Sequence, residues 1–216
     1  MSSEASTPSD GPPNMGAAGE PVVLASANPK KVAELREILG EVLDLRPRPP
    51  LSEVPDVVED APDFVGNARL KAAALVDATG MASLADDSGL EVDALGGAPG
   101  VISARYAGEP TDDAANVARL LAELEGHDDP AERQARFRCV LVLQRPDGSE
   151  VVAEGTVEGH IAHSPRGDGG FGYDPVFVPG KGDPDLTFAE MDPAAKHAIS
   201  HRGRALADLL AQLTDS

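Results

Sequence analysis

The chain of 216 residues contains no tryptophan and one cysteine, Cys139. A single cysteine excludes an internal disulfide, which is typical of proteins from a reducing cytoplasm. Cys139 begins the apolar run CVLVL, where we expect a buried thiol rather than a nucleophile. No apolar run reaches the ~20 residues that a membrane-spanning helix needs. The sequence therefore predicts a soluble, cytoplasmic protein with no membrane partner.

Basic residues are also scarce, since 18 Lys and Arg stand against 37 Asp and Glu and the formal net charge is -19. Such a chain repels a bare phosphate backbone, which argues against nucleic acid as a partner. A nucleotide substrate would need a metal ion to screen its charge and local basic residues to bind it. There are only five lysines, and Lys31, Lys71 and Lys196 all fall in candidate site motifs.

Residues 1–20 are rich in Ser, Pro, Gly and Ala and contain no Lys or Arg. A signal peptide needs a basic start and an apolar stretch, so we interpret this segment as a disordered tail. The remaining residues, 21–216, are enough for one sizeable core, and we expect a single domain there.

Apolar periodicity and turn residues predict a mixed α/β fold. A strand over 21–25 runs through a polar turn into a helix that stops at Gly40. Two β-rich runs around Pro146-Asp147-Gly148 predict a hairpin. The further expected elements are helices over 63–79 and 111–125, a short buried strand over 81–85, a polar loop over 127–134, and one last helix that begins at Pro193. We expect a hairpin lobe set against a helical lobe, with a cleft between them.

The segment Ser26-Ala27-Asn28-Pro29-Lys30-Lys31 lies at the first strand-to-helix turn. Free N–H groups and the helix dipole make such a turn a phosphate-binding site. Its side chains add hydrogen-bond donors and positive charge. An ordinary capped helix with solvated lysines is the alternative.

The segment Asp86-Asp87-Ser88-Gly89 follows the expected strand over 81–85. Ligand sites of open α/β sheets lie at the carboxyl ends of strands, and one or two carboxylates are a common way to hold Mg²⁺. An Asx turn is the alternative. Glu59 could be a second metal ligand and Lys71 could neutralise phosphate, although each is also compatible with a solvated surface charge.

Residues 167–172 match G-x-G-x-x-G, but a strand rather than a helix is expected after them, which excludes a dinucleotide fingerprint. A loop in which Phe171 and the backbone wrap a base is the functional interpretation, and a plain glycine turn is the alternative. In the last helix, Arg202 is expected to point inward, where a cation needs an anion or a ring. His160, His163 and His197 lack the spacing of a zinc site and are expected at the surface.

Taken together, the chain from Val22 to Leu210 resembles the Ham1-like, or RdgB-like, inosine/xanthosine triphosphate pyrophosphatases. The resemblance rests on an ordered set of motifs: Ser26-x-Asn28-x-x-Lys31, Asn67-Ala68-x-x-Lys71-Ala72, Ala85-Asp86-Asp87-Ser88-Gly89-Leu90, Gly96-Gly97-Ala98-Pro99-Gly100, Ser103-Ala104-Arg105-Tyr106, Gly169-Gly170-Phe171-Gly172-Tyr173-Asp174-Pro175 and Ile199-Ser200-His201-Arg202-Gly203.

The resemblance implies an elongated mixed sheet with two α/β lobes, a central cleft and a homodimer. It implies Mg²⁺-dependent hydrolysis of purine nucleoside triphosphates such as ITP, dITP and XTP to the monophosphate and pyrophosphate. By the same resemblance, Asp87 activates water and binds the metal with Glu59. The implied substrate-binding residues are Ser26, Ala27, Asn28, Pro29, Lys30, Lys31, Lys71 and Lys196 for the triphosphate, and Ser88, Phe171, Gly172, Tyr173, Asp174, His201 and Arg202 for sugar and base.

Three positions depart from the family pattern: Gly66 replaces a frequent Glu, Asp63 a frequent Thr, and Ser26 a frequent Thr. The first two border the implied metal site. Two rival functions are a nucleotide sensor without turnover and a Maf-like pyrophosphatase for modified pyrimidine nucleotides. Asp87, Lys71 and Lys196 argue against the first, and the Ser-His-Arg and Phe-Gly-Tyr-Asp motifs argue against the second.

Overall fold

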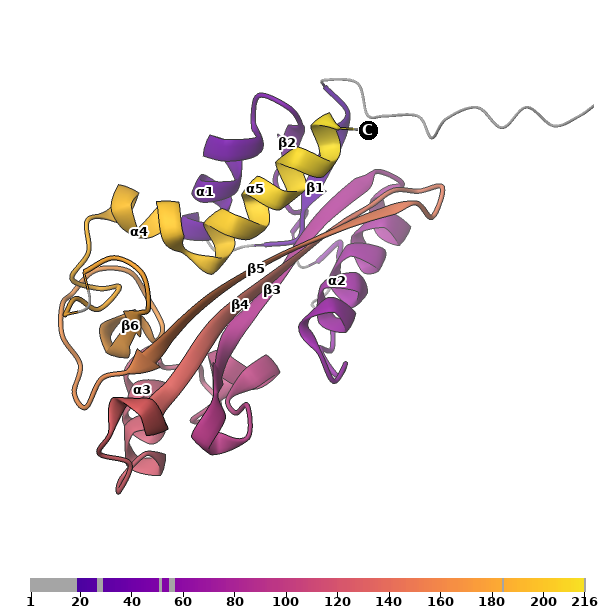
Figure 1. Cartoon of the computed structure of the whole chain (residues 1–216). Helices are drawn as coiled ribbons and strands as arrows, with labels where there is room; N and C mark the ends of the chain where they lie inside the picture. Colours follow the sequence, from indigo (N-terminus) through magenta and orange to yellow (C-terminus); the bar gives the residue numbers. More distant parts are fainter. Residues whose placement is uncertain (1–18, 27–28, 51, 55–56, 184, 216) are drawn as a thin grey trace, which may run out of the picture.

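One mixed six-stranded sheet organises the chain, in the order β2-β1-β3-β4-β5-β6 (Figure 1). The computed structural model describes residues 19–26, 29–50, 52–54, 57–183 and 185–215, and only the backbone of Pro29, Lys30 and Glu34. β1 is parallel to β2 and β3, whereas the pairs β3–β4, β4–β5 and β5–β6 are antiparallel. The strands are β1 (Pro21–Leu24), β2 (Asp44–Arg46), β3 (Ala82–Val92), β4 (Gln134–Gln144), β5 (Glu150–Ile161) and β6 (Phe177–Pro179). The expected α/β class is therefore confirmed, and most of the expected tail, residues 1–18, lies outside the described residues.

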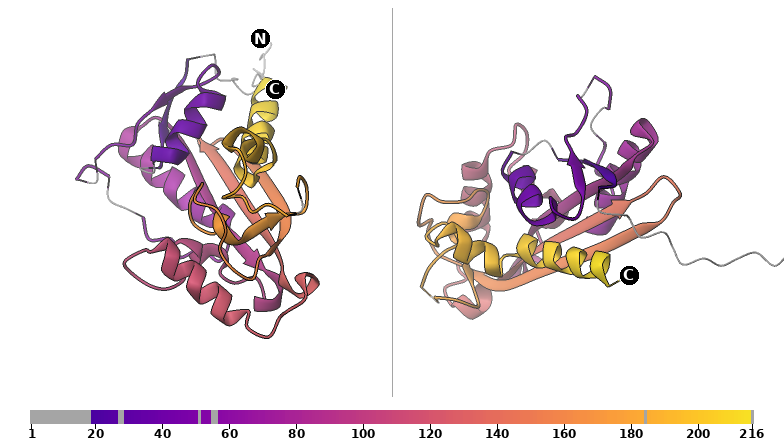
Figure 2. Two further views of the ribbon diagram at one scale, coloured as in Figure 1. Left: turned by 90° about the vertical axis from the view of Figure 1, so that its left-hand side faces the viewer. Right: turned by 90° about the horizontal axis from the view of Figure 1, so that it is seen from above.

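Helices cover both faces of the sheet at the end where β1 lies (Figures 1 and 2). The helices are α1 (Pro29–Leu39), α2 (Phe64–Thr79), α3 (Asp113–Glu123), α4 (Pro193–Ile199) and α5 (His201–Thr214). α1 and α5 share a core cluster with Leu141 and Leu143, whereas α2 packs on Val140 and Val142. Because successive residues of a strand point to opposite faces, α2 lies on the face opposite to α1 and α5.

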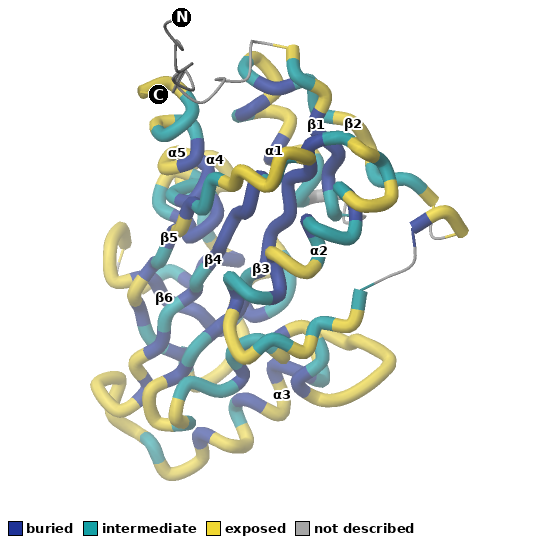
Figure 3. The backbone as a smooth tube through the Cα atoms, turned by 90° about the vertical axis from the view of Figure 1, so that its right-hand side faces the viewer, coloured by how far each residue is buried: buried dark blue, intermediate teal, exposed yellow. Residues whose placement is uncertain are grey.

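A second core fills the far end of the molecule. It joins α3 to the long strands and β6 through buried residues such as Leu120, Phe137 and Phe177. Figure 3 shows the central strands dark blue between more exposed ends. The two cores build the two lobes of the elongated fold, with β3, β4 and β5 running through both.

Local sequence explains where α2 begins and ends. The Asp63 carboxylate accepts the Gly66 amide at 2.7 Å as an N-cap, and Gly80 closes the helix in a left-handed conformation. A β-carbon on Gly66 would stand 2.5 Å from the Ala61 β-carbon. The structure therefore explains both residues that depart from the family pattern. Asp63 caps the helix, and Gly66 leaves room for the Ala61 side chain.

Two expectations about elements are wrong. The strand expected over 81–85 continues to Val92, so Asp86-Asp87-Ser88-Gly89 lies within β3 and is neither a strand end nor an Asx turn. The single last helix is two helices: Ser200 is extended, ends α4 and caps α5 by accepting the Gly203 amide at 3.0 Å. The polar loop expected over 127–134 also contains a short 3₁₀ helix, Pro130–Arg133.

The edge of β3 explains how a site can form in the middle of a strand. β1 pairs with β3 only as far as Leu24 and Leu84, and the Ala25 amide adds a last hydrogen bond to the Leu84 carbonyl. Within the described residues no other strand pairs with this edge of β3 over residues 85–90. In the described part of the chain this edge is therefore free of strand pairing from the point where β1 turns into α1 as far as Leu90, whose amide donates to Ser103 Oγ at 2.9 Å, and we call this stretch the open edge of β3.

Candidate active site

A cavity of about 930 Å³ lies beside this open edge. The first lobe contributes Lys31 and Ser88, and the rest of the lining comes from the far lobe and the α4–α5 junction. The lining includes the expected residues Phe171, Gly172, Tyr173, Asp174, Lys196, His201 and Arg202. Nine of the residues expected from sequence to bind substrate are therefore gathered around one space.

The expected phosphate turn is only partly described. Ser26 follows β1 and α1 begins at Pro29, so free helix amides point into the region beyond the end of β1. Ala27 and Asn28 lie outside the described residues, as do the side chains of Pro29 and Lys30. Lys31, in the first turn of α1, reaches the sheet and its Nζ lies 2.7 Å from Asp86 Oδ2.

Asp86 is a buried carboxylate that contacts two cations of the site. Its side chain is 6% exposed, and the same Oδ2 lies 3.8 Å from Arg202 Nη2. Burial by itself would raise the pKa of Asp86, but the charges of Lys31, Arg202 and Lys71 outweigh it and hold the pKa well below its usual range. Asp86 is therefore an anion that is locked between cations.

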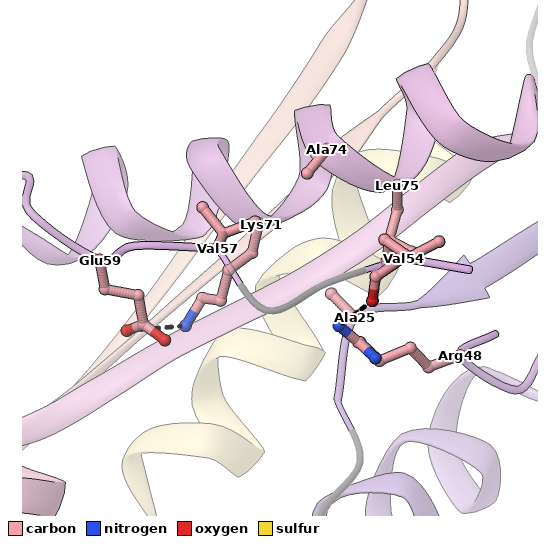
Figure 4. Close-up of a pocket in the computed structure, with 8 residues that line it drawn as sticks. All are labelled: Ala25, Arg48, Val54, Val57, Glu59, Lys71, Ala74 and Leu75. Atoms are coloured by element: carbon pink, nitrogen blue, oxygen red, sulfur yellow. Dashed lines mark hydrogen bonds and ion pairs between the residues drawn. The ribbon is translucent and has the colours of Figure 1, made fainter. Parts of the chain in front are cut away.

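Asp87 faces the other side of the sheet and belongs to a separate group with Lys71 and Glu59. Lys71 Nζ, from α2, lies 2.8 Å from Asp87 Oδ1 and 3.4 Å from Glu59 Oε2. Figure 4 shows the Lys71 amine directed at Glu59 beside a small cavity of about 110 Å³, which both residues line. The geometry thus brings together the two expected metal ligands and the expected phosphate lysine.

Electrostatics fit Asp87 to the role of a base. Burial raises its pKa, and although Lys71 opposes this effect, Glu59 and Asp86 reinforce it. For Lys71, burial acts to lower the pKa, but Asp87, Asp86 and Glu59 together raise it. Asp87 is consequently a more basic carboxylate than an exposed aspartate, and Lys71 remains a cation.

The carboxylates also fit a divalent cation. Asp87 Oδ2 is buried and has no hydrogen-bond partner in the described part of the chain, while Oδ1 accepts from Lys71. A buried carboxylate oxygen without a donor is costly unless a ligand meets it. Residues 19–215, apart from the gaps given above, contain no cluster of three or more His, Cys, Asp or Glu side chains that could hold a metal. The two carboxylates of Asp87 and Glu59 suit Mg²⁺, which binds through one or two carboxylates and completes its coordination shell with water and phosphate.

The glycine-rich loop is shaped around Asp174. Asp174 Oδ2 accepts the Phe171 amide at 2.8 Å and lies 2.6 Å from Lys196 Nζ. A β-carbon on Gly170 would stand 2.0 Å from Asp174 Oδ2. Gly170 also has a φ of +73°, a conformation that disfavours any residue with a side chain, so both sterics and backbone geometry require glycine here. Lys196 Nζ lies 5.5 Å from the centre of the Phe171 ring, and Arg202 Cζ lies 5.7 Å from it. The loop therefore presents an aromatic ring between two cations at the cavity wall.

His201 and Arg202 are both buried at the start of α5. The His201 ring stacks on Phe137 with centroids 4.7 Å apart. Burial lowers the pKa of His201 well below its usual value, and Arg202, Lys196 and Lys31 add to this effect. Arg202 points inward, as expected, but it does so because α5 restarts at His201 rather than because one helix continues.

The sequence analysis missed several contributors. Asp113 accepts the Gly172 amide at 2.8 Å and lines the cavity with Phe137. His197, expected at the surface, also lines the cavity. The sequence assigns no role to Asp86, and its place beside Asp87 in the motif is the only local sign that it belongs to the site. Its contacts with Lys31 and Arg202 join distant parts of the chain and cannot be predicted from a local pattern.

Comparisons with known proteins show which family the chain belongs to. The Ham1 family model matches residues 22–212. The dITP/XTP pyrophosphatase of Rhodospirillum centenum is 47% identical over 195 residues, covering 90% of this chain and 95% of that protein. The dITP/XTP pyrophosphatase of Mycobacterium bovis is 53% identical over 197 residues, with 89% and 94% covered.

Solved structures show the same fold. A HAM1 protein from Coxiella burnetii superimposes with a TM-score of 0.82 at 44% identity, covering 91% of this chain and all of that one. A nucleoside-triphosphatase / dITP/XTP pyrophosphatase from Mycobacterium abscessus gives 0.73 at 48% identity, with 89% and 99% covered. No helix in the described part of the chain is long and apolar enough to span a bilayer. With matching motifs, matching fold and nearly full coverage, this chain belongs to the Ham1 family.

Proposed function

We propose that this chain is a nucleoside-triphosphate pyrophosphatase that hydrolyses ITP, dITP and XTP to the monophosphate and pyrophosphate with Mg²⁺, and so removes non-standard purines from the nucleotide pool. The observation that carries the proposal is the pairing of a cavity large enough for a nucleoside with a separate lysine–carboxylate group across the open edge of β3. The names of the two relatives above, both dITP/XTP pyrophosphatases, support the substrate class.

The base and sugar occupy the larger cavity in this proposal. Phe171 supplies a ring for stacking, and the Arg202 guanidinium supplies a planar set of donors. A 6-keto oxygen, as in hypoxanthine and xanthine, accepts a hydrogen bond from Arg202. The amino group of adenine would face one donor with another and leave polar groups unpaired, which disfavours ATP.

The triphosphate runs from this cavity over the open edge of β3, past the start of α1, toward Lys71. Lys31 meets the chain of phosphates first, on the Asp86 side of the sheet, and Lys71 meets it on the Asp87 side. The free amides of the first turn of α1 add neutral donors between them. Fixed positive groups of this kind stabilise the charge that develops on the phosphoryl oxygens during attack.

Asp87 and Glu59 are the residues that would hold Mg²⁺. When bound there, the ion would neutralise phosphate charge and polarise the attacked phosphoryl group. Asp87 accepts the proton of the attacking water, because its raised pKa makes it a better base than a solvated carboxylate. Lys71 holds Asp87 through Oδ1 and thereby directs Oδ2 toward the substrate side.

A substrate panel with and without Mg²⁺ tests the proposal. ITP, dITP, XTP, GTP, ATP and modified pyrimidine triphosphates would be incubated with the full chain, and products separated by anion-exchange chromatography. We expect monophosphate and pyrophosphate from ITP, dITP and XTP, much slower turnover of ATP, and no turnover in EDTA. Stepwise release of orthophosphate, equal rates on ATP, or full activity in EDTA would each contradict it.

The same panel decides between the rival functions. Tight binding of ITP without any product would identify a sensor, and a preference for modified pyrimidines would identify a Maf-like activity. The family resemblance further supports a homodimer and a cytoplasmic location. Light scattering on the purified chain tests the first, since a monomeric mass at micromolar concentration would contradict it, and cell fractionation tests the second.

A further inference from the structure

Asp86 is the point where the two halves of the candidate site meet. Its Oδ2 is 2.7 Å from Lys31 Nζ, on the side of the phosphates, and 3.8 Å from Arg202 Nη2, on the side of the base. These cations come from α1 and α5, which are 171 residues apart in sequence (202 − 31). One carboxylate oxygen therefore contacts cations from both ends of the chain.

The carboxylate of Asp86 is shared by two positive groups, and both contact the same oxygen atom. Arg202 Nη2 is also 3.4 Å from Ser88 Oγ, two residues further along the same face of β3. Without the negative charge at position 86, the buried Arg202 and the part-buried Lys31 would repel each other where solvent screens them poorly.

We propose that Asp86 is a positioning residue that holds the phosphate-binding Lys31 and the base-selecting Arg202 in one fixed geometry, so that base recognition is coupled to phosphate placement. The inference rests on the proposed function, because it assigns Arg202 to the base and Lys31 to the triphosphate. Asp86 itself does not take the proton of the attacking water, since its side chain faces the sheet surface opposite to Asp87 and Lys71.

A comparable device in the same cavity supports this role. Asp174 is also buried, and it fixes Lys196 at 2.6 Å. In both places a buried carboxylate fixes a cation that lines the cavity. Such preorganisation removes the cost of immobilising a long, flexible side chain when the substrate binds.

Steady-state kinetics of Asp86→Asn, Arg202→Ala and the double variant on ITP and ATP test the coupling. We expect Asp86→Asn to lower the ITP-to-ATP ratio of kcat/KM by about tenfold to a hundredfold. We expect the double variant to give the same ratio as Arg202→Ala alone, because Asp86 acts on the base through Arg202. An unchanged ratio in Asp86→Asn, or additive losses in the double variant, would overturn the proposal. Asp147→Asn, in the β4–β5 turn, removes a carboxylate far from the cavity and should keep the wild-type ratio.

A structural measurement separates this inference from the proposed function. If the wild-type chain does not hydrolyse ITP, the proposed function fails, whereas the positioning role can still be examined by crystallography of Asp86→Asn. We expect Lys31 and Arg202 to leave their wild-type positions in that variant. Side chains that stay in place would overturn the positioning role whatever the substrate. Should Asp86→Asn not fold, Asp86→Glu, which keeps the charge and moves it by one methylene, serves in both experiments. We expect it to shift both cations and lower the ratio, and unchanged cations or an unchanged ratio would overturn the role.

Discussion

Asp86 and Asp87 are consecutive in β3, yet one contacts Lys31 and Arg202 on the α1/α5 face and the other contacts Lys71 on the α2 face. The alternation of a strand enforces this separation. It gives two neighbouring carboxylates different partners and opposite pKa shifts, lowered for Asp86 and raised for Asp87. In the proposed function, both side chains act on one substrate because, among the described residues, the edge of β3 is free of strand pairing between them and the cavity.

The first prediction concerns the base. Asp87→Asn keeps the shape of the side chain and removes its basicity. We expect kcat for ITP to fall by roughly 10²-fold or more, as for loss of a general base, and further if metal binding is lost. Rapid-quench measurement of pyrophosphate release checks this result. A near-normal kcat would show that Asp87 is not the general base.

The second prediction concerns the loop that carries Phe171. Asp113 accepts the Gly172 amide at 2.8 Å and so ties the loop to the start of α3. We expect Asp113→Ala to raise KM for ITP by about threefold to tenfold, since one hydrogen bond to a charged group is lost, with a smaller change in kcat. Asp113→Asn keeps an acceptor oxygen and should lie closer to wild type. Equal KM values in wild type and Asp113→Ala would mean that Asp174 alone fixes the loop.

The third prediction concerns stability. The buried Arg133 guanidinium donates to the carbonyls of Leu124, His127, Ile161 and Ala162, joining the end of α3 to the end of β5. Arg133→Met removes all four hydrogen bonds, of which those to Leu124 and Ile161 are buried, and we expect a loss of about 3 kcal/mol in the free energy of unfolding. For a chain of this size that loss lowers Tm by about 6–12 °C.

Differential scanning calorimetry measures the change in Tm. Arg136→Met is the matched control, because Arg136 makes part-exposed ion pairs with Glu158 and Asp93 on the sheet surface. Such pairs contribute about 0–1 kcal/mol each. Similar shifts in Tm for the two variants would show that the Arg133 hydrogen bonds do not dominate the stability of this lobe.

The fourth prediction concerns pH. Because the pKa of His201 is lowered in the folded chain, the unfolded chain binds a proton near pH 6.5 that the folded chain excludes. The stability present above pH 6.5 is therefore lost as pH falls below that value, with a slope approaching about 1.4 kcal/mol per pH unit for this group. Urea unfolding of the substrate-free chain between pH 5 and pH 7.5 measures it.

We expect His201→Gln to flatten this part of the pH dependence, because the variant has no imidazole to exclude a proton. The exposed His163 gives the control, and His163→Gln should keep the wild-type slope. Parallel curves for wild type and His201→Gln would show that His201 stays accessible to protons in the folded chain.

The sequence by itself determined the elements whose signals are local. Apolar periodicity and capping residues were sufficient for β1, α1, α2 and the β4–β5 hairpin. The ordered motifs also identified the family, and they contain most of the residues that line the cavity. Their charged, aromatic and glycine residues are the types that bind a nucleotide.

Only the tertiary structure decided where β3 ends and what its side chains meet. The run Asp86-Asp87-Ser88-Gly89 looks like a turn in isolation, and it is held extended by ten residues of pairing with β4. Ser200 likewise caps a new helix, and the start of that helix approaches β5 at Gly155, where a β-carbon would stand 2.0 Å from the His201 carbonyl oxygen. The ion pairs of Asp86 and Asp87 join residues 16 to 116 positions apart in the sequence. Only the packing of helices on both faces of the sheet brings these residues together, so no local sequence pattern predicts the pairs.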